Sequence, residues 1–256
     1  MSAALRQIPL LILALLAVDV ALVLAPAIDY AAGSPYPRLR KLLDLGGEMT
    51  VQAWYSSVQW AVAAALFAFV FFHAYRNRMQ GAIPMGLLTL ACLAFSVDEV
   101  VAVHEWIGDK SDVLLPGGDR ANTSFSRTGI WPFLLGIPVL AILGTLVVRV
   151  RHIFIPRSRR ALLLLIAGLA AMFTGALAVE LAVNLVEPTD DYSGWLLLQH
   201  VFEEFLEMLG ITLIIWSGLA LLRDHGFVLQ MPATKPQRAT RREPSHSHVG
   251  AGHPAT

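Results

Sequence analysis

The sequence has little charge and a single cysteine, Cys92. Charged residues make up 15% of its 256 residues and hydrophobic residues 56%, whereas soluble domains are about a quarter charged. One cysteine excludes an internal disulfide framework. The formal net charge is zero, so no basic surplus points to a nucleic-acid partner. This apolar composition with little charge is typical of a membrane protein.

Lysine and arginine are absent from the interiors of the long apolar runs, which are each about 20 residues or more and so long enough to cross a bilayer. The first run resembles a signal peptide in length, but Asp19 interrupts it and further runs follow, so we expect it to be retained. We predict six transmembrane helices, over residues 8–32, 48–73, 83–106, 130–150, 161–186 and 195–222.

The predicted fold is an all-α, polytopic membrane helix bundle over residues 1–224, with both termini cytoplasmic. Five arginines at the end of the fourth run and in the loop before the fifth favour this orientation, and the basic segment 38–41 is the exception to it. Residues 225–256 are rich in His, Arg and Pro, which predicts a disordered cytoplasmic tail. The expected location is the bacterial inner membrane.

The sixth run contains four ionisable residues at helical spacing. His200, Glu203, Glu204 and Glu207 stand at positions i, i+3, i+4 and i+7, so they line one face of a helix. An ionisable residue inside a membrane span is costly to bury and therefore indicates function.

Three other runs have polar residues at a similar depth. They are Glu48, Gln52 and Tyr55 in the second, Asp98, Glu99, His104 and Glu105 in the third, and Glu180, Asn184 and Glu187 in the fifth. Because successive spans run in opposite directions, all of these fall in the outer half of the bilayer. We therefore expect them to meet in one site. On a straight helix Asp98 and Glu105 share a face, but Glu99 and His104, at i+5, do not.

The interiors of the runs contain no lysine or arginine, and Arg120 or Arg127 could reach the acids from the loop after the third run but would not neutralise all of them. The acids therefore need protons, water or cations. Carboxylates and histidines from four helices are the ligand set of di-iron and di-manganese bundles, although those bundles use Glu-x-x-His where this chain has His-x-x-Glu. We expect a divalent metal, iron or zinc, with manganese as a further option. The expected ligands are Asp98, His104, Glu105, Glu180, His200, Glu203 and Glu207.

The other polar side chains of these runs are expected to act in catalysis or to surround the ligands. Glu204 and Glu99 are the expected catalytic carboxylates, as general bases. The residues expected to surround and orient the ligands are Glu48, Gln52, Tyr55, Asn184 and Glu187. Asp19, alone in the first run, is interpreted either as a helix-packing residue or as a proton relay.

Three segments together resemble a family of bacterial multi-span membrane proteins without an assigned activity. They are Gly47-Glu48 with Trp54-Tyr55-Ser56-Ser57, Ser96-Val97-Asp98-Glu99 with His104-Glu105, and Glu203-Glu204 with Glu207. The resemblance implies that the acids form a set, and it implies no chemistry. Membrane hydrolases of the alkaline-ceramidase type are a weaker match, because their His-x-x-x-His element is missing.

The sequence leaves several functions open. The first is a metal-dependent oxidase, hydroxylase or hydrolase that acts on a lipid-soluble substrate. The second is a cation or proton transporter or relay, and the third is an accessory membrane subunit that senses a metal. A protonated, hydrogen-bonded packing network is the plain alternative to all three. Membrane lipids are the expected surroundings, no nucleic acid is expected, and the oligomeric state is left open.

Overall fold

The computed structural model describes residues 8–47, 49–156, 158–185 and 192–226, and every regular element in these ranges is helical. Six helical segments within them are long and apolar enough to cross a membrane, which confirms the predicted all-α bundle. The chain is a multi-pass membrane protein. Glu48, Glu187 and residues 227–256 of the expected tail lie outside the described residues.

The spans follow one another in a simple order. They are α1 (Leu10–Ala31), α3 (Val51–Arg76), α4 (Ala82–Val101), the π-helical turn η5 (Pro132–Gly136) with α6 (Ile137–Phe154), α7 (Arg159–Phe173) with the π-helical turn η6 (Thr174–Val179), α8 (Glu180–Ala182) and the 3-10 turn η7 (Val183–Leu185), and α9 (Tyr192–Asp224). Short helices α2 (Pro37–Leu42) and α5 (Val103–Ser111) lie outside the spans.

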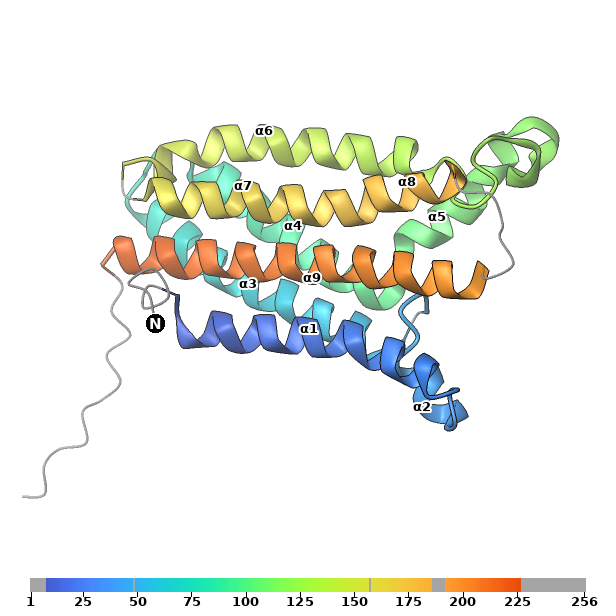
Figure 1. Ribbon diagram of the computed structural model, residues 1–256. Coiled ribbons are helices and arrows are strands. Elements are labelled where there is room, and N and C mark those ends of the chain that lie inside the picture. Colours follow the sequence, from blue (N-terminus) through green and yellow to red (C-terminus); the bar gives the residue numbers. More distant parts are fainter. Residues whose placement is uncertain (1–7, 48, 157, 186–191, 227–256) are drawn as a thin grey trace, which may run out of the picture.

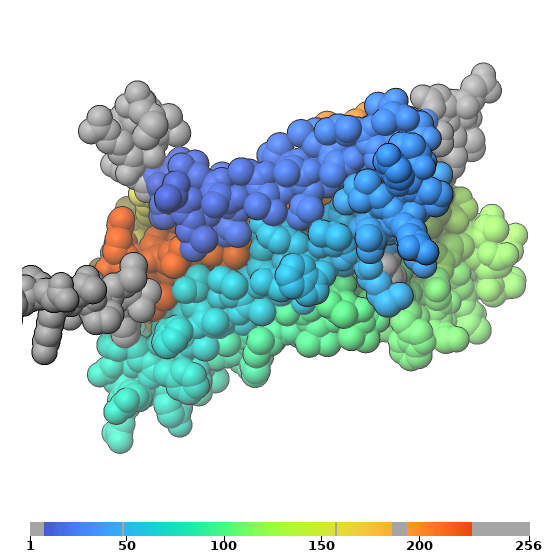
Figure 2. Space-filling model, turned by 90° about the horizontal axis from the view of Figure 1, so that it is seen from below, coloured from blue at the N-terminus to red at the C-terminus, as the bar shows by residue number. Residues whose placement is uncertain are grey.

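The central helix of the bundle is α9, because it packs against α1, α3 and α7 at once (Figure 1). Helix α3 pairs with α4, and α6 packs against α4 and α7. Helix α1 lies along one outer face of the bundle, beside α3 (Figure 2).

Glycines allow α7 and α9 to approach each other closely. A Cβ atom added at Gly210 would lie 2.6 Å from the carbonyl oxygen of Gly168, and one added at Gly168 would lie 2.7 Å from that of Gly210. Small residues at such a crossing are common between membrane helices, where backbone contact replaces the hydrophobic effect as the packing force.

The polar ends of four spans meet at one end of the bundle, as their alternating directions predict. The starts of α3 and α9, the end of α4, and η7 all lie there, together with α2 and α5 (Figure 1). We call this the α5 end. The start of α1 and the end of α9 lie at the opposite end.

The third span differs from the predicted continuous helix over 83–106. Helix α4 ends at Val101, and Ala102 adopts a left-handed conformation with φ of 52° before α5 begins at Val103. A left-handed alanine costs about 1–2 kcal/mol. The bend is stabilised by Asp98, whose carboxylate accepts a hydrogen bond from the backbone N–H of His104 at 3.1 Å.

Candidate intramembrane acid site

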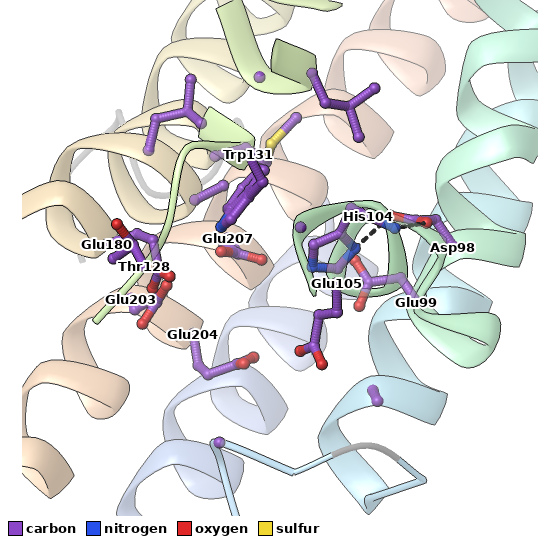
Figure 3. Close-up of a pocket in the computed structure, with 18 of the residues that line it drawn as sticks. Asp98, Glu99, His104, Glu105, Thr128, Trp131, Glu180, Glu203, Glu204 and Glu207 are labelled. Atoms are coloured by element: carbon purple, nitrogen blue, oxygen red, sulfur yellow. Dashed lines mark hydrogen bonds and ion pairs between the residues drawn. The ribbon is translucent and has the colours of Figure 1, made fainter. Parts of the chain in front are cut away.

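One cavity of about 400 Å³ lies at the α5 end, between α4, α5, η6, α8 and α9 (Figure 3). Every residue predicted as a ligand or a catalytic carboxylate lines it. These residues are Asp98, Glu99, His104, Glu105, Glu180, His200, Glu203, Glu204 and Glu207. We call this cavity the acid cavity.

The bend at Ala102 brings together two residues that a straight helix would separate. Nδ1 of His104 lies 2.7 Å from a carboxylate oxygen of Asp98, and the ring packs against Trp131 with centroids 5.4 Å apart. Burial lowers the pKa of His104, but the hydrogen bond and charge of Asp98 outweigh it, so the pKa is raised overall. Because the chain turns at Ala102, both Glu99 and His104 reach the cavity.

The acids on α9 meet the end of the fifth span. The carboxyl groups of Glu203 and Glu180 lie against each other within hydrogen-bonding reach (Figure 3). On its other side, Glu203 accepts a hydrogen bond from Nε2 of Gln199 at 3.2 Å. Gly175 in η6 permits this approach, because a Cβ there would lie 2.7 Å from the carbonyl oxygen of Glu203.

The loop after α2 covers the ring of His200. A Cβ added at Gly46 would lie 2.6 Å from Cε1 of that ring, so the glycine backbone rests directly on the imidazole. Leu45, Gly46 and Gly47 all line the acid cavity. From the sequence, this Gly-Gly pair indicates only the end of a segment, and nothing in it predicts a contact with α9.

The segment between α5 and η5 supplies two arginines to the cavity lining, Arg120 and Arg127. Arg120 is held by Asp112 at 2.6 Å and Asp109 at 2.5 Å, and the hydrogen bond to Asp112 raises its pKa. Asn184 holds the same segment in place: it accepts from the backbone N–H of Arg127 at 3.1 Å and donates to Thr128 at 2.9 Å.

Gln52 and Tyr55, predicted to lie beside the ligands, do not line the acid cavity. Both face α1 instead: Tyr55 contacts Asp19, and Gln52 contacts the carbonyl oxygen of Leu22. The sequence places them at the right depth, but depth alone does not decide which neighbouring helix a side chain faces.

The remaining wall of the acid cavity is apolar. It is lined by Trp60, Phe95, Leu135, Val139, Phe173 and Leu177. The cavity therefore combines an acidic side with a hydrophobic side, and its volume falls within the range of about 300–1,000 Å³ that is usual for ligand pockets.

The acids line a common space without forming a compact metal cage. Among the described residues, no three His, Cys, Asp or Glu side chains are gathered closely enough to hold a metal ion. The glutamates reach the cavity on flexible side chains, and Glu204 and Glu105 are directed toward the same space (Figure 3).

Comparisons with curated proteins and with solved structures find no match. One family model matches, described as a domain of unknown function (DUF8692), and the match covers residues 10–222. It includes all six spans and the nine acidic and imidazole residues of the cavity. The chain belongs to this DUF8692 family.

Proposed function

We propose that the protein is a membrane-embedded, metal-dependent enzyme, an oxidase, hydroxylase or hydrolase, that acts on a lipid-soluble substrate. One observation carries the proposal: nine acidic and imidazole side chains from four elements line a single cavity whose other wall is apolar. Packing alone does not require so many ionisable groups in one intramembrane space.

The composition of the acidic side supports a divalent cation as its occupant. The two arginines of the lining are too few to neutralise all of its carboxylates. Carboxylates left without a counter-charge repel one another, and each unpaired buried charge costs several kcal/mol. Imidazole and carboxylate together suit iron, zinc or manganese. Glu203, Glu204 and Glu207 are the glutamates of α9 that would share such an ion.

The contact between Asp98 and His104 also supports a metal. Histidines that bind metals usually donate their second ring N–H to a carboxylate, which fixes the ring and the tautomer. With Nδ1 held by Asp98 at 2.7 Å, Nε2 of His104 is the ring nitrogen left to face the cavity. A divalent cation there would polarise a substrate oxygen or activate water, and iron would allow oxidation.

The apolar wall supports a lipid-soluble substrate. The hydrophobic part of such a molecule would lie against Trp60, Phe95 and Phe173, with its reactive group toward the acids. Glu204 and Glu99 are the carboxylates proposed to move protons during the reaction. We place the protein in the bacterial inner membrane, with the α5 end on the extracytoplasmic side.

Metal analysis of the detergent-purified protein tests the proposal directly. Wild type should contain iron, zinc or manganese, and a chelator should lower its melting temperature, with recovery when the ion is restored. Glu204→Gln should abolish this metal-dependent shift. Asp224→Asn is a matched control on the same helix, since Asp224 lies at the opposite end and pairs with Arg223, and it should keep the shift.

The metal-dependent shift is the measurement that matters, because Glu204→Gln alone also relieves carboxylate repulsion and changes the melting temperature without metal. A wild-type protein that purifies without metal and shows no shift with any of the three ions would overturn the proposal.

A further inference from the structure

A second buried carboxylate lies outside the acid cavity, where α1 meets α3 and α9. The side chain of Asp19 is fully buried and accepts hydrogen bonds from three neutral groups. The donors are Tyr55 Oη at 2.8 Å, Gln59 Nε2 at 3.1 Å and Thr212 Oγ1 at 2.8 Å. Asp19 lies in the middle of α1, far along the span from either end.

An ionised carboxylate in this position would be costly, because none of its three partners carries a positive charge. Its charge must be balanced by a proton or by a bound cation. The polar atoms around it are 2.8–3.1 Å away, which are hydrogen-bond lengths, and Asp19 and Thr212 have no exposed surface. Gln59 also presents an amide N–H to the carboxylate, which cannot bind a metal ion, so the geometry favours a proton.

The hydroxyl of Tyr55 suits both protonation states of Asp19. It has one proton but two acceptors within reach, Asp19 Oδ1 at 2.8 Å and the carbonyl oxygen of Leu15 at 3.3 Å. It donates to Asp19 when the carboxylate is ionised. When Asp19 holds a proton, Tyr55 can donate to Leu15 and accept from Asp19. Only a hydroxyl rotation separates the two states.

A polar seam connects Asp19 to the α5 end. Gln52, Tyr55 and Gln59 stand at i, i+3 and i+7 on α3, all facing α1, and Gln52 Nε2 contacts the carbonyl oxygen of Leu43 in the loop after α2 at 3.4 Å. Oε1 of Gln52 and Oε1 of Gln59 are buried and have no hydrogen-bond partner. Buried acceptors without partners indicate a donor that the protein does not supply, such as water or a hydrated proton.

From these observations we propose that Asp19 is an intramembrane proton-binding site, filled from the α5 end through the seam of Gln52, Tyr55 and Gln59. The site is independent of any metal in the acid cavity. Among the side chains that hydrogen-bond to Asp19, Tyr55 of α3 is the ionisable one and Thr212 of α9 is neutral. Asp29 lies further along α1, and the acids and His200 of α9 line the acid cavity instead.

Infrared spectroscopy of the wild type and of Asp19→Asn in lipid tests the site. The wild type should show a carbonyl band of a protonated carboxylic acid that is missing in Asp19→Asn. Thr212→Val removes a hydrogen bond to the same group, so it should move this band to higher frequency, which keeps the assignment testable if Asp19→Asn fails to fold. A spectrum in which neither variant alters any carboxylic-acid band would overturn the proposal.

The route is tested by exchange into D₂O. The Asp19 band should shift as its proton is replaced, and Gln52→Leu should slow this shift several-fold. Gln199→Leu is the matched control: Gln199 is also a buried glutamine with an unpartnered Oε1, but it faces Glu203, so it should exchange like the wild type. An Asp19 band that never exchanges in the folded protein, or that exchanges equally fast in Gln52→Leu, would contradict the proposal.

Discussion

His104 and Asp98 make two hydrogen bonds across the bend at Ala102. The ring of His104 contacts one carboxylate oxygen of Asp98 at 2.7 Å, and the backbone N–H of His104 donates to the other at 3.1 Å. One carboxylate therefore both stabilises the break in the third span and orients an imidazole at the acid cavity. The shape of the chain and the chemistry of the site depend on the same side chain.

In the protein without bound metal, the protonation of His104 should make stability depend on pH. Its pKa is raised above the ordinary 6.5, so the folded state binds the proton more tightly than the unfolded state does. This stabilisation is complete below pH 6.5 and is lost as pH rises through the raised pKa. The wild type should therefore melt at a higher temperature than His104→Gln at low pH, and this difference should shrink as the pH rises above 6.5.

Asp98→Asn should lower the pKa of His104 and so weaken this effect. Without the carboxylate, burial still opposes protonation, and only the charges of Glu105 and Glu99 are left to favour it. NMR titration of the ring of His104 in detergent would measure the change directly. A titration midpoint that does not move between wild type and Asp98→Asn would show that Asp98 does not control His104.

The contact between α7 and α9 should not tolerate a larger residue. Gly210→Ala places a Cβ 2.6 Å from the carbonyl oxygen of Gly168, and backbone cannot easily give way, so we expect a loss of about 1–3 kcal/mol in the free energy of unfolding. Gly144→Ala on α6 is the control, since no atom lies within 4 Å of its added Cβ. Thermal unfolding in detergent should separate the two, and equal stability would contradict the close approach.

Gln52 should stabilise α1 through a carbonyl group that Pro26 leaves without its usual partner. Because proline has no N–H, the carbonyl oxygen of Leu22 lacks the helical hydrogen bond from residue 26, and Gln52 Nε2 donates to it at 3.3 Å. Gln52→Leu should cost about 1 kcal/mol. The cost should be smaller in a Pro26→Ala background, where the helix supplies its own donor, and a double-mutant cycle measures this coupling.

The orientation of the bundle can be measured by cysteine labelling. The native Cys92 is buried, so it should give little background. Val113→Cys, exposed near the α5 end, should react with a membrane-impermeant reagent added outside intact cells. Asn77→Cys, between α3 and α4 at the other end, should react only after permeabilisation. The opposite pattern would place the acid cavity on the cytoplasmic side.

Length, hydropathy and the absence of lysine and arginine are enough to predict six spans and the shared depth of the acids. Spans and depth can be predicted because the cost of burying a side chain in the bilayer depends on its polarity, which can be read from the sequence. The bend at Ala102 could not be predicted, because the segment Val101-Ala102-Val103 contains neither glycine nor proline. The contact that stabilises the bend comes from Asp98, which lies before this segment. The grouping of Tyr55 with Asp19 depends on the rotation of α3 about its axis, which one sequence does not reveal.

The π-helical turn η6, directly before Glu180, has a consequence for how the site could arise. A π turn holds one more residue than the α-helical turn it replaces. Because the wider turn takes up the extra residue, Glu180 keeps nearly the direction that it would have on a regular helix one residue shorter. If Thr174–Val179 were a regular α-helix of the same length, Glu180 would be rotated by about 100°, away from Glu203. Two chains of equal length with the same bundle could thus differ in whether the fifth span reaches the cavity at all, through the form of this one turn.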